Sequence, residues 1–300
     1  MMGRHAVEWS RTSVGPSDMG IAVRAVTKEL KGRLILDRVD LEVPRGTLAV
    51  LEGSNGTGKT TLIRTLATVV APDSGTAVVN GFDVVNQSLE VRRSIGVSFA
   101  NDRSLYWRIN AFENLELFGK IAGLSKAAIS GRSADLVEQL RLGGVATLQV
   151  SRLSTGQRQR LMVARALLTD PAVILLDEPF RGIDEEGLHS IVELVTDRVA
   201  NGATALIVAP LIDAIVPVAD AIYRIREGAI RQAATDGSSG TSGSTGSTGP
   251  TGSAGGLAPP DPLSARPAGA PSPGQPDIVP EGPAASGQRP DAGEPLRRQS

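Results

Sequence analysis

One segment, GSNGTGKTT from Gly53 to Thr61, constrains the fold of this chain more than any other feature. It matches the pattern G-x-x-x-x-G-K-[ST], with Gly58, Lys59 and Thr60 at the later fixed positions. An apolar run precedes the segment and a helical stretch follows it, so the sequence predicts strand, loop and helix in that order. Such a loop turns backbone N–H groups toward phosphate oxygens, and the helix N-terminus adds partial positive charge. The segment therefore predicts a phosphate-binding loop; the alternative is an ordinary glycine turn before a helix.

The same segment supplies most of the candidate ligands for a nucleotide. The Lys59 ammonium is expected to reach the β- and γ-phosphates, and the Thr60 hydroxyl can ligate Mg²⁺. ATP and Mg²⁺ are therefore the predicted cofactors. The predicted nucleotide-binding residues of this loop are Gly53, Ser54, Asn55, Gly56, Thr57, Gly58, Lys59, Thr60 and Thr61.

Charge and hydropathy exclude several other classes of protein. The 300 residues carry a formal net charge of −1, so no nucleic-acid partner is expected. The chain has no cysteine, which excludes disulfides and thiolate metal sites. The N-terminus has no apolar core of a signal peptide, and no apolar run approaches the ~18 residues of a membrane span.

The composition changes sharply near Arg231. From there to Ser300 the chain has no aromatic residue, and Gly, Ser, Thr, Pro and Ala dominate. Such a segment cannot bury enough apolar surface to offset its ordering entropy. Glycine recurs at every third position in part of it, but a collagen-like helix needs more proline. We predict a flexible extension over 1–19, one folded domain over 20–231 and a disordered tail over 232–300.

Strands alternate with helices through the folded part, which predicts an α/β fold with a mostly parallel sheet covered on both faces. The predicted strands are 21–26, 36–43, 47–53, 76–81, 95–99, 173–177 and 203–209, with a terminal hairpin over 221–230, and the predicted helices are 59–70, 111–122, 126–142, 155–168 and 185–200.

A second chemical motif is the apolar strand VILLD, which ends in Asp177 and is followed by Glu178. After a phosphate-binding loop, an apolar strand that ends in acid has the Walker B arrangement. Asp177 can hold Mg²⁺, and Glu178 can act as general base toward an attacking water. The alternative is a strand-end acidic pair that faces solvent.

A third motif, Leu153-Ser154-Thr155-Gly156-Gln157, stands just before an amphipathic helix. Together with the first two motifs it resembles the ATP-binding cassette (ABC) family of ATPases, whose signature is usually L-S-G-G-Q. Thr155 replaces the first of its two glycines. A hydroxyl, a glycine backbone and a helix N-terminus are still offered to an anion. The alternative is a helix cap without a ligand.

The resemblance covers about residues 21–231 and implies more than the motifs do. It implies a P-loop NTPase fold of the ABC type, with an antiparallel β subdomain and a helical subdomain. In this family the signature closes over ATP held by a partner subunit, so Ser154, Thr155, Gly156 and Gln157 are predicted to bind nucleotide in trans. Asp184 matches the aspartate of the D-loop and joins the predicted nucleotide-binding residues.

The segment from Asn101 to Leu115 is similar to the Q-loop region of the drug and polysaccharide exporter branch. That resemblance implies a separate ABC-2 type membrane permease, a second ATPase subunit, and a peripheral place on the cytoplasmic face of the membrane. Tyr106, Trp107 and Arg108 would lie near the permease contact. Local core packing is the alternative for Tyr106 and Trp107.

Three positions depart from the family pattern. Leu30 stands where an aromatic residue stacks on adenine. The Q-loop glutamine falls at Ala100 or at Asn101, and Asn101, with the same amide on a shorter stem, is the better candidate catalytic residue beside Glu178 and Lys59. Pro210 stands where the switch histidine is expected, and it has no side-chain donor.

Only two histidines are present, His5 and His189, and neither follows the strand 203–209. We expect His189 to be solvated or packed on its helix. Losing a positioned donor of the switch-histidine kind costs roughly 10²–10³ in rate. The sequence therefore predicts an ATP-hydrolysing exporter subunit with slow turnover. The alternative is a degenerate regulatory or heterodimer-partner subunit with little or no turnover.

Overall fold

The computed structural model describes residues 18–100, 104–210 and 215–233. All of them belong to one compact unit, Met1–Ser239. The predicted extension 1–19 and tail 232–300 lie almost wholly outside the described residues, so these boundaries stay predictions.

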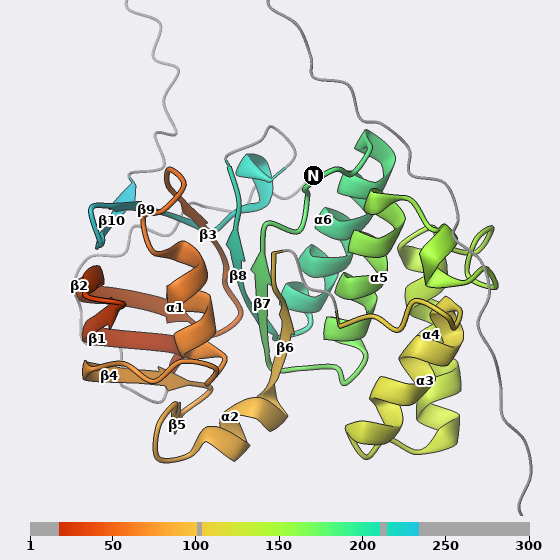
Figure 1. The fold of residues 1–300 in the computed structure, drawn as a ribbon, viewed down its shortest axis with the longest axis horizontal. Helices are drawn as coiled ribbons and strands as arrows, with labels where there is room; N and C mark the ends of the chain where they lie inside the picture. Colours follow the sequence, from red (N-terminus) through yellow and green to blue (C-terminus); the bar gives the residue numbers. More distant parts are fainter. Residues whose placement is uncertain (1–17, 101–103, 211–214, 234–300) are drawn as a thin grey trace, which may run out of the picture. The chain divides into compact units, whose positions relative to one another are not determined.

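The centre of this unit is a six-stranded sheet (Figure 1). Its neighbouring strands from β9 to β6 pair in parallel, and β10 alone pairs antiparallel, with β9. The predicted mostly parallel sheet is thus confirmed. In spatial order the strands are β10 (Ala229–Ala233), β9 (Ala221–Arg226), β3 (Leu48–Glu52), β8 (Thr204–Val208), β7 (Val173–Asp177) and β6 (Ile95–Ser98).

Side chains of the central strands alternate between two hydrophobic cores. In β3, Leu48 and Val50 pack into one core, whereas Ala49 and Leu51 pack into the other. The strands β7 and β8 alternate in the same way. Because successive side chains of a strand point to opposite faces, strands buried on both faces read as continuous apolar runs.

One face of the parallel sheet is covered by helices (Figure 1). The helices α5 (Thr155–Leu167) and α6 (Glu185–Ala200) pack there, and the pair α3 (Ala111–Ile121) and α4 (Lys126–Gln139) extends this layer into a helical subdomain. The prediction ran α4 to residue 142, but Arg141 has a φ of 53°, which ends the helix. The short α2 (Ser88–Ser94) was not predicted.

The opposite face carries α1 (Lys59–Leu66) and a four-stranded antiparallel sheet. That sheet runs in the order β2 (Arg33–Pro44), β1 (Met19–Leu30), β4 (Ser74–Val79) and β5 (Phe82–Asp83). The strands β1 and β2 are longer than predicted because a tight turn at Lys31 and Gly32 continues their pairing. Register shifts in β1 broke the apolar alternation on which the prediction relied.

The carboxyl ends of the parallel strands share one edge of the sheet. The loop of Gly53 to Gly58 follows β3, Glu178 follows β7 and Pro210 follows β8 closely. In open α/β sheets ligands bind at this edge, so the topology brings the predicted chemistry together. No helix in the described part of the chain is long and apolar enough to span a membrane.

Candidate functional site

The loop after β3 adopts a conformation that its glycines permit. Gly56 has a φ of 81° and Gly58 a φ of 101°, both in the region that favours glycine. A Cβ atom on Gly58 would lie 2.8 Å from the carbonyl oxygen of Ile35. Gly58 is the N-cap of α1 and no side chain caps that helix. The first N–H groups of α1 are therefore left for a ligand.

The Lys59 side chain is held by the loop itself. Its ammonium donates hydrogen bonds to the carbonyl oxygens of Gly53, at 2.7 Å, and Ser54, at 2.8 Å. The Thr57 hydroxyl donates to the same Ser54 carbonyl at 2.8 Å. The cation is nearly buried, and two of its three N–H donors are bonded to backbone carbonyls, so a bound phosphate would compete with these carbonyls for it.

Asp177 is the buried acid of the site. Only 1% of its surface is exposed, and both carboxylate oxygens lack a hydrogen-bond partner among the described residues. Burial raises the pKa of this carboxyl, and the Glu178 charge raises it further. The Thr60 hydroxyl, the Ala100 amide and the Lys59 charge lower the pKa in part, although none of them completes a hydrogen bond to Asp177.

The oxygens around Asp177 suit a hard divalent cation. A buried carboxylate without a partner beside the Thr60 hydroxyl is an oxygen-only donor set of the kind that Mg²⁺ prefers. The described residues contain no group of three His, Cys, Asp or Glu side chains that could hold a metal ion. A cation here would therefore take its remaining ligands from water and from phosphate oxygens.

Glu178 stands at a turn directly after β7. Its φ is 50°, and its backbone N–H donates to the Val208 carbonyl at 2.8 Å. This bond ties the residue to the neighbouring strand β8. The carboxylate is about one-third exposed (32%) and lies 3.8 Å from the Arg181 guanidinium. The backbone is thus fixed while the carboxylate remains accessible to water.

One cavity of about 950 Å³ joins these elements. The loop residues 53–57 and Lys59 line it, with Glu178, Ala209 and Pro210. Pro210 therefore lies in the cavity that holds the predicted general base. Leu30, which stands where the family has an aromatic residue, does not line the cavity. Asn101 lies outside the described residues, so its assignment stays a prediction.

The residues that line one side of this cavity were not predicted from the sequence. Residues 33–35 at the start of β2 and 224–228 at the β9–β10 turn also line it. Because β9 is parallel to β3 and adjacent to it, the end of β9 reaches the same edge as the phosphate-binding loop. The turn then packs on β2, where the Asp37 N–H donates to the Gly228 carbonyl at 3.2 Å. The sequence showed a terminal hairpin, but not its place beside β3.

The signature residues form a self-contained helix start away from this cavity. The Ser154 hydroxyl accepts from the Gln157 N–H at 3.1 Å, and the Gln157 side chain accepts from the Ser154 N–H at 2.8 Å. This capping box satisfies two orphan donors of α5. A Cβ atom on Gly156 would lie 2.9 Å from the Gly182 carbonyl oxygen, so only glycine fits there. Ser154 and Thr155 remain exposed.

An arginine that the sequence analysis did not single out connects this helix start to Trp107. Arg158 donates to the Leu153 carbonyl and, at 3.2 Å, to the Thr155 hydroxyl. Its guanidinium lies 5.4 Å from the centroid of the Trp107 ring, at cation–π distance. Trp107 and Tyr106 are 49% and 52% exposed, so neither ring is core packing.

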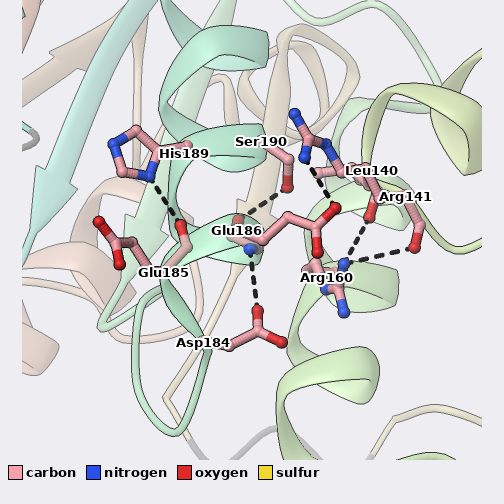
Figure 2. A network of polar contacts seen from close by, with 9 residues as sticks. Leu140, Arg141, Arg160, Asp184, Glu185, Glu186, His189 and Ser190 are labelled. Carbon is pink, nitrogen blue, oxygen red and sulfur yellow. Dashed lines mark hydrogen bonds and ion pairs between the residues drawn. The ribbon is translucent and has the colours of Figure 1, made fainter.

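Asp184 caps α6 rather than lining the cavity. Its carboxylate accepts from the Gly187 N–H at 2.9 Å, as Figure 2 shows. His189 lies one turn further along, with Nδ1 2.7 Å from the Glu185 carbonyl oxygen, so it packs on its own helix as expected. The buried Arg160 of α5 donates to the carbonyls of Leu140 and Arg141 at the end of α4 (Figure 2).

The structure thus divides the predicted site residues into two groups. The loop of Gly53 to Thr61, Asp177 and Glu178 lie together at the carboxyl edge of the sheet. The signature residues and Asp184 line no part of that cavity.

Known proteins that are similar to this chain belong to one family. The model of the ABC transporter family matches residues 36–181. The chain is 34% identical over 192 residues to the ABC transporter ATP-binding protein NatA of Bacillus subtilis, covering 64% of this chain and 78% of that protein. It is 37% identical to the doxorubicin resistance ATP-binding protein DrrA of Mycobacterium tuberculosis, over 71% of this chain and 65% of that protein, somewhat less than two thirds of its length.

Solved structures show the same fold. The structure of an ATP-binding subunit of an ABC transporter is similar with a TM-score of 0.65 at 25% identity, over 71% of this chain and 89% of that chain. The predicted fold and the predicted family resemblance are both confirmed.

Proposed function

This chain belongs to the ABC transporter family, and from that premise we propose that it is the ATP-hydrolysing subunit of an exporter. It is an ATP-binding subunit by family. We further propose that this subunit couples ATP-driven closure of a dimer to transport through a separate ABC-2 type permease, at the cytoplasmic face of the membrane. The observation that carries it is the single cavity lined by the phosphate-binding loop and by Glu178, with the unpartnered Asp177 carboxylate behind it.

We assign the chemistry to residues of this cavity. The loop amides and the N-terminus of α1 hold the β- and γ-phosphates, and Lys59 leaves the carbonyls of Gly53 and Ser54 to bind them. Asp177 and Thr60 would hold Mg²⁺, which neutralises phosphate charge when bound. Glu178 accepts the proton of the attacking water. Asn101 is proposed to orient that water.

The second half of the site is proposed to come from another subunit. Ser154 and Thr155 are exposed at the N-terminus of α5, and they do not line the cavity of their own chain. Backbone N–H groups at a helix start attract anions. We propose that residues 154–157, with Asp184 nearby on α6, close over ATP held by a second ATPase subunit. The site of one chain is incomplete without this contribution.

Pro210 supports slow turnover. It lines the cavity on the side of Glu178, and its ring offers no hydrogen-bond donor to the γ-phosphate. A site that lacks one positioned donor is expected to lose roughly 10²–10³ in rate. The substrate class is supported only by the printed names of relatives, which include resistance to doxorubicin and export of Nod factor.

Steady-state ATP hydrolysis by the purified full chain tests the proposal, alone and with its permease. We expect turnover that needs Mg²⁺ and that Glu178→Gln abolishes, while ATP binding is retained. Chelating Mg²⁺ with EDTA is the matched loss-of-metal control. ATP binding without turnover in either setting would contradict the proposal and support the degenerate regulatory subunit.

A further inference from the structure

The cavity has two sides, which the strand order separates. In the sheet, β9 lies on one side of β3, and β8 and β7 lie on the other. Glu178 and Pro210 therefore stand on one side of the phosphate-binding loop, and the β9–β10 turn stands on the opposite side. If the γ-phosphate faces Glu178, as the proposed function requires, the base and ribose of the nucleotide must extend toward the turn.

The side away from Glu178 is lined by cations and aliphatic groups. Leu34 and Ile35 of β2 and Ile225 of β9 form its apolar surface. Arg33, Arg224, Arg226 and Glu227 line it as well. No aromatic side chain lines the cavity in the described part of the chain. A nucleobase that enters here meets no ring on which to stack.

The arginines of this side differ in their pairing. Arg224 forms an ion pair with Glu52 and is held on the end of β3. Arg33 and Arg226 are exposed and have no ion-pair partner within residues 18–100, 104–210 and 215–233. With Arg224 neutralised, Arg33, Arg226 and Glu227 leave this side with an excess of positive charge.

From this arrangement we propose that Arg33 and Arg226 form the platform for the nucleobase. The inference rests on the proposed function, because it takes the direction of the nucleotide from the position of Glu178. A guanidinium is planar, delocalised and weakly hydrated, and it stacks on the faces of aromatic rings. Leu34 and Ile35 complete the apolar contact below the base. Both arginines are specificity-determining residues for ATP binding, and neither takes part in hydrolysis.

Titration calorimetry on the full chain tests this assignment. The parent carries Glu178→Gln to prevent turnover, and MgATP is compared with inorganic tripolyphosphate, which has no base. In Arg33→Ala/Arg226→Ala we expect ATP affinity to fall about 4- to 25-fold, from roughly two- to fivefold for each cation–π contact. Affinity for tripolyphosphate should not change. The matched control is Arg231→Ala, an exposed arginine of β10 that does not line the cavity.

A lysine pair separates stacking from charge. Arg33→Lys/Arg226→Lys keeps both charges but loses the planar groups, and it should recover only part of the ATP affinity. Full recovery with lysine would overturn the platform, as would an equal loss for ATP and tripolyphosphate, or no loss for ATP. A parent that binds neither probe would instead contradict the proposed function.

Discussion

The phosphate-binding loop and the helix start that carries the signature are both anion-binding motifs. They differ in whether their polar groups find hydrogen-bond partners in the ligand-free chain. At the loop, Asp177 is buried without a partner, and Lys59 bonds to carbonyls of its own loop. At the signature, Ser154 and Gln157 satisfy each other in a capping box.

The difference shows which half of the site depends on a ligand. Burying a carboxylate without a hydrogen bond or a counter-ion costs stability, and a bound cation removes that cost. The capping box needs no ligand, because it stabilises α5 in the free chain. The phosphate-binding loop and Asp177 are therefore expected to gain stability when nucleotide and metal bind. The signature at the start of α5 is expected to keep the same conformation with or without a ligand.

The largest expected effect is on turnover at the signature. Thr155→Asp places a negative charge on the exposed first turn of α5, where it suits the helix but repels the phosphates of a partner's ATP. We expect turnover to fall by about 10³, with ATP binding and thermal stability retained. Ala127→Asp, in the exposed first turn of α4, is the matched control. Unchanged turnover in Thr155→Asp would contradict a role of the signature in hydrolysis.

A smaller effect, an increase in turnover, is expected from a substitution in the cavity itself. Pro210→His adds a donor beside Glu178 and should raise turnover by about 10- to 100-fold. Pro210→Ala, which removes the ring but adds no donor, should not. Steady-state hydrolysis at saturating MgATP compares the two. Equal rates in both variants would show that the missing donor does not limit the reaction.

The stability of the nucleotide-free chain is the next test. Asp177→Asn should raise the free energy of unfolding of the nucleotide-free chain at neutral pH, because burial raises the pKa of the Asp177 carboxyl above its ordinary value of 3.8. A raised pKa gives the wild type stability below pH 3.8 that is lost as pH rises through the folded-state pKa, so the advantage of the variant appears above that pH.

The control for this test is Asp184→Asn, in the other half of the site. Asn caps a helix about as well as Asp does, so its stability should not change. Denaturant unfolding without nucleotide measures both. If Asp177→Asn destabilises the chain as an ordinary buried substitution would, the unpaired Asp177 carboxylate does not lower the stability of the free chain.

The smallest expected effect is a loss of stability when the capping box of α5 is broken. Ser154→Ala should cost about 1 kcal/mol, because it leaves the Gln157 N–H without its acceptor and removes the reciprocal support of the bond from the Ser154 N–H to the Gln157 side chain. Ser125→Ala removes a single capping bond from α4 and should cost less. Thermal unfolding of the two variants compares them. A larger loss in Ser125→Ala would show that the box adds nothing to α5.

The sequence was sufficient wherever a local pattern determined local structure. The strand before the phosphate-binding loop, the apolar strand before Asp177 and the helix that begins at Thr155 lie as predicted, because each depends on residues close in the chain. The lining by Arg33 and Arg226 was not predicted. It depends on β9 pairing beside β3, a contact between residues far apart in the sequence.

Mixing two inactive variants shows whether the phosphate-binding loop of one chain works with the signature of another chain. Lys59→Ala removes the lysine that binds the phosphates, and Thr155→Asp blocks the signature. Each should be inactive alone, and an equal mixture should recover about a quarter of wild-type turnover, because half of randomly paired dimers hold one intact site. No recovery, with dimers formed and ATP bound by Thr155→Asp, would contradict a site shared between two chains.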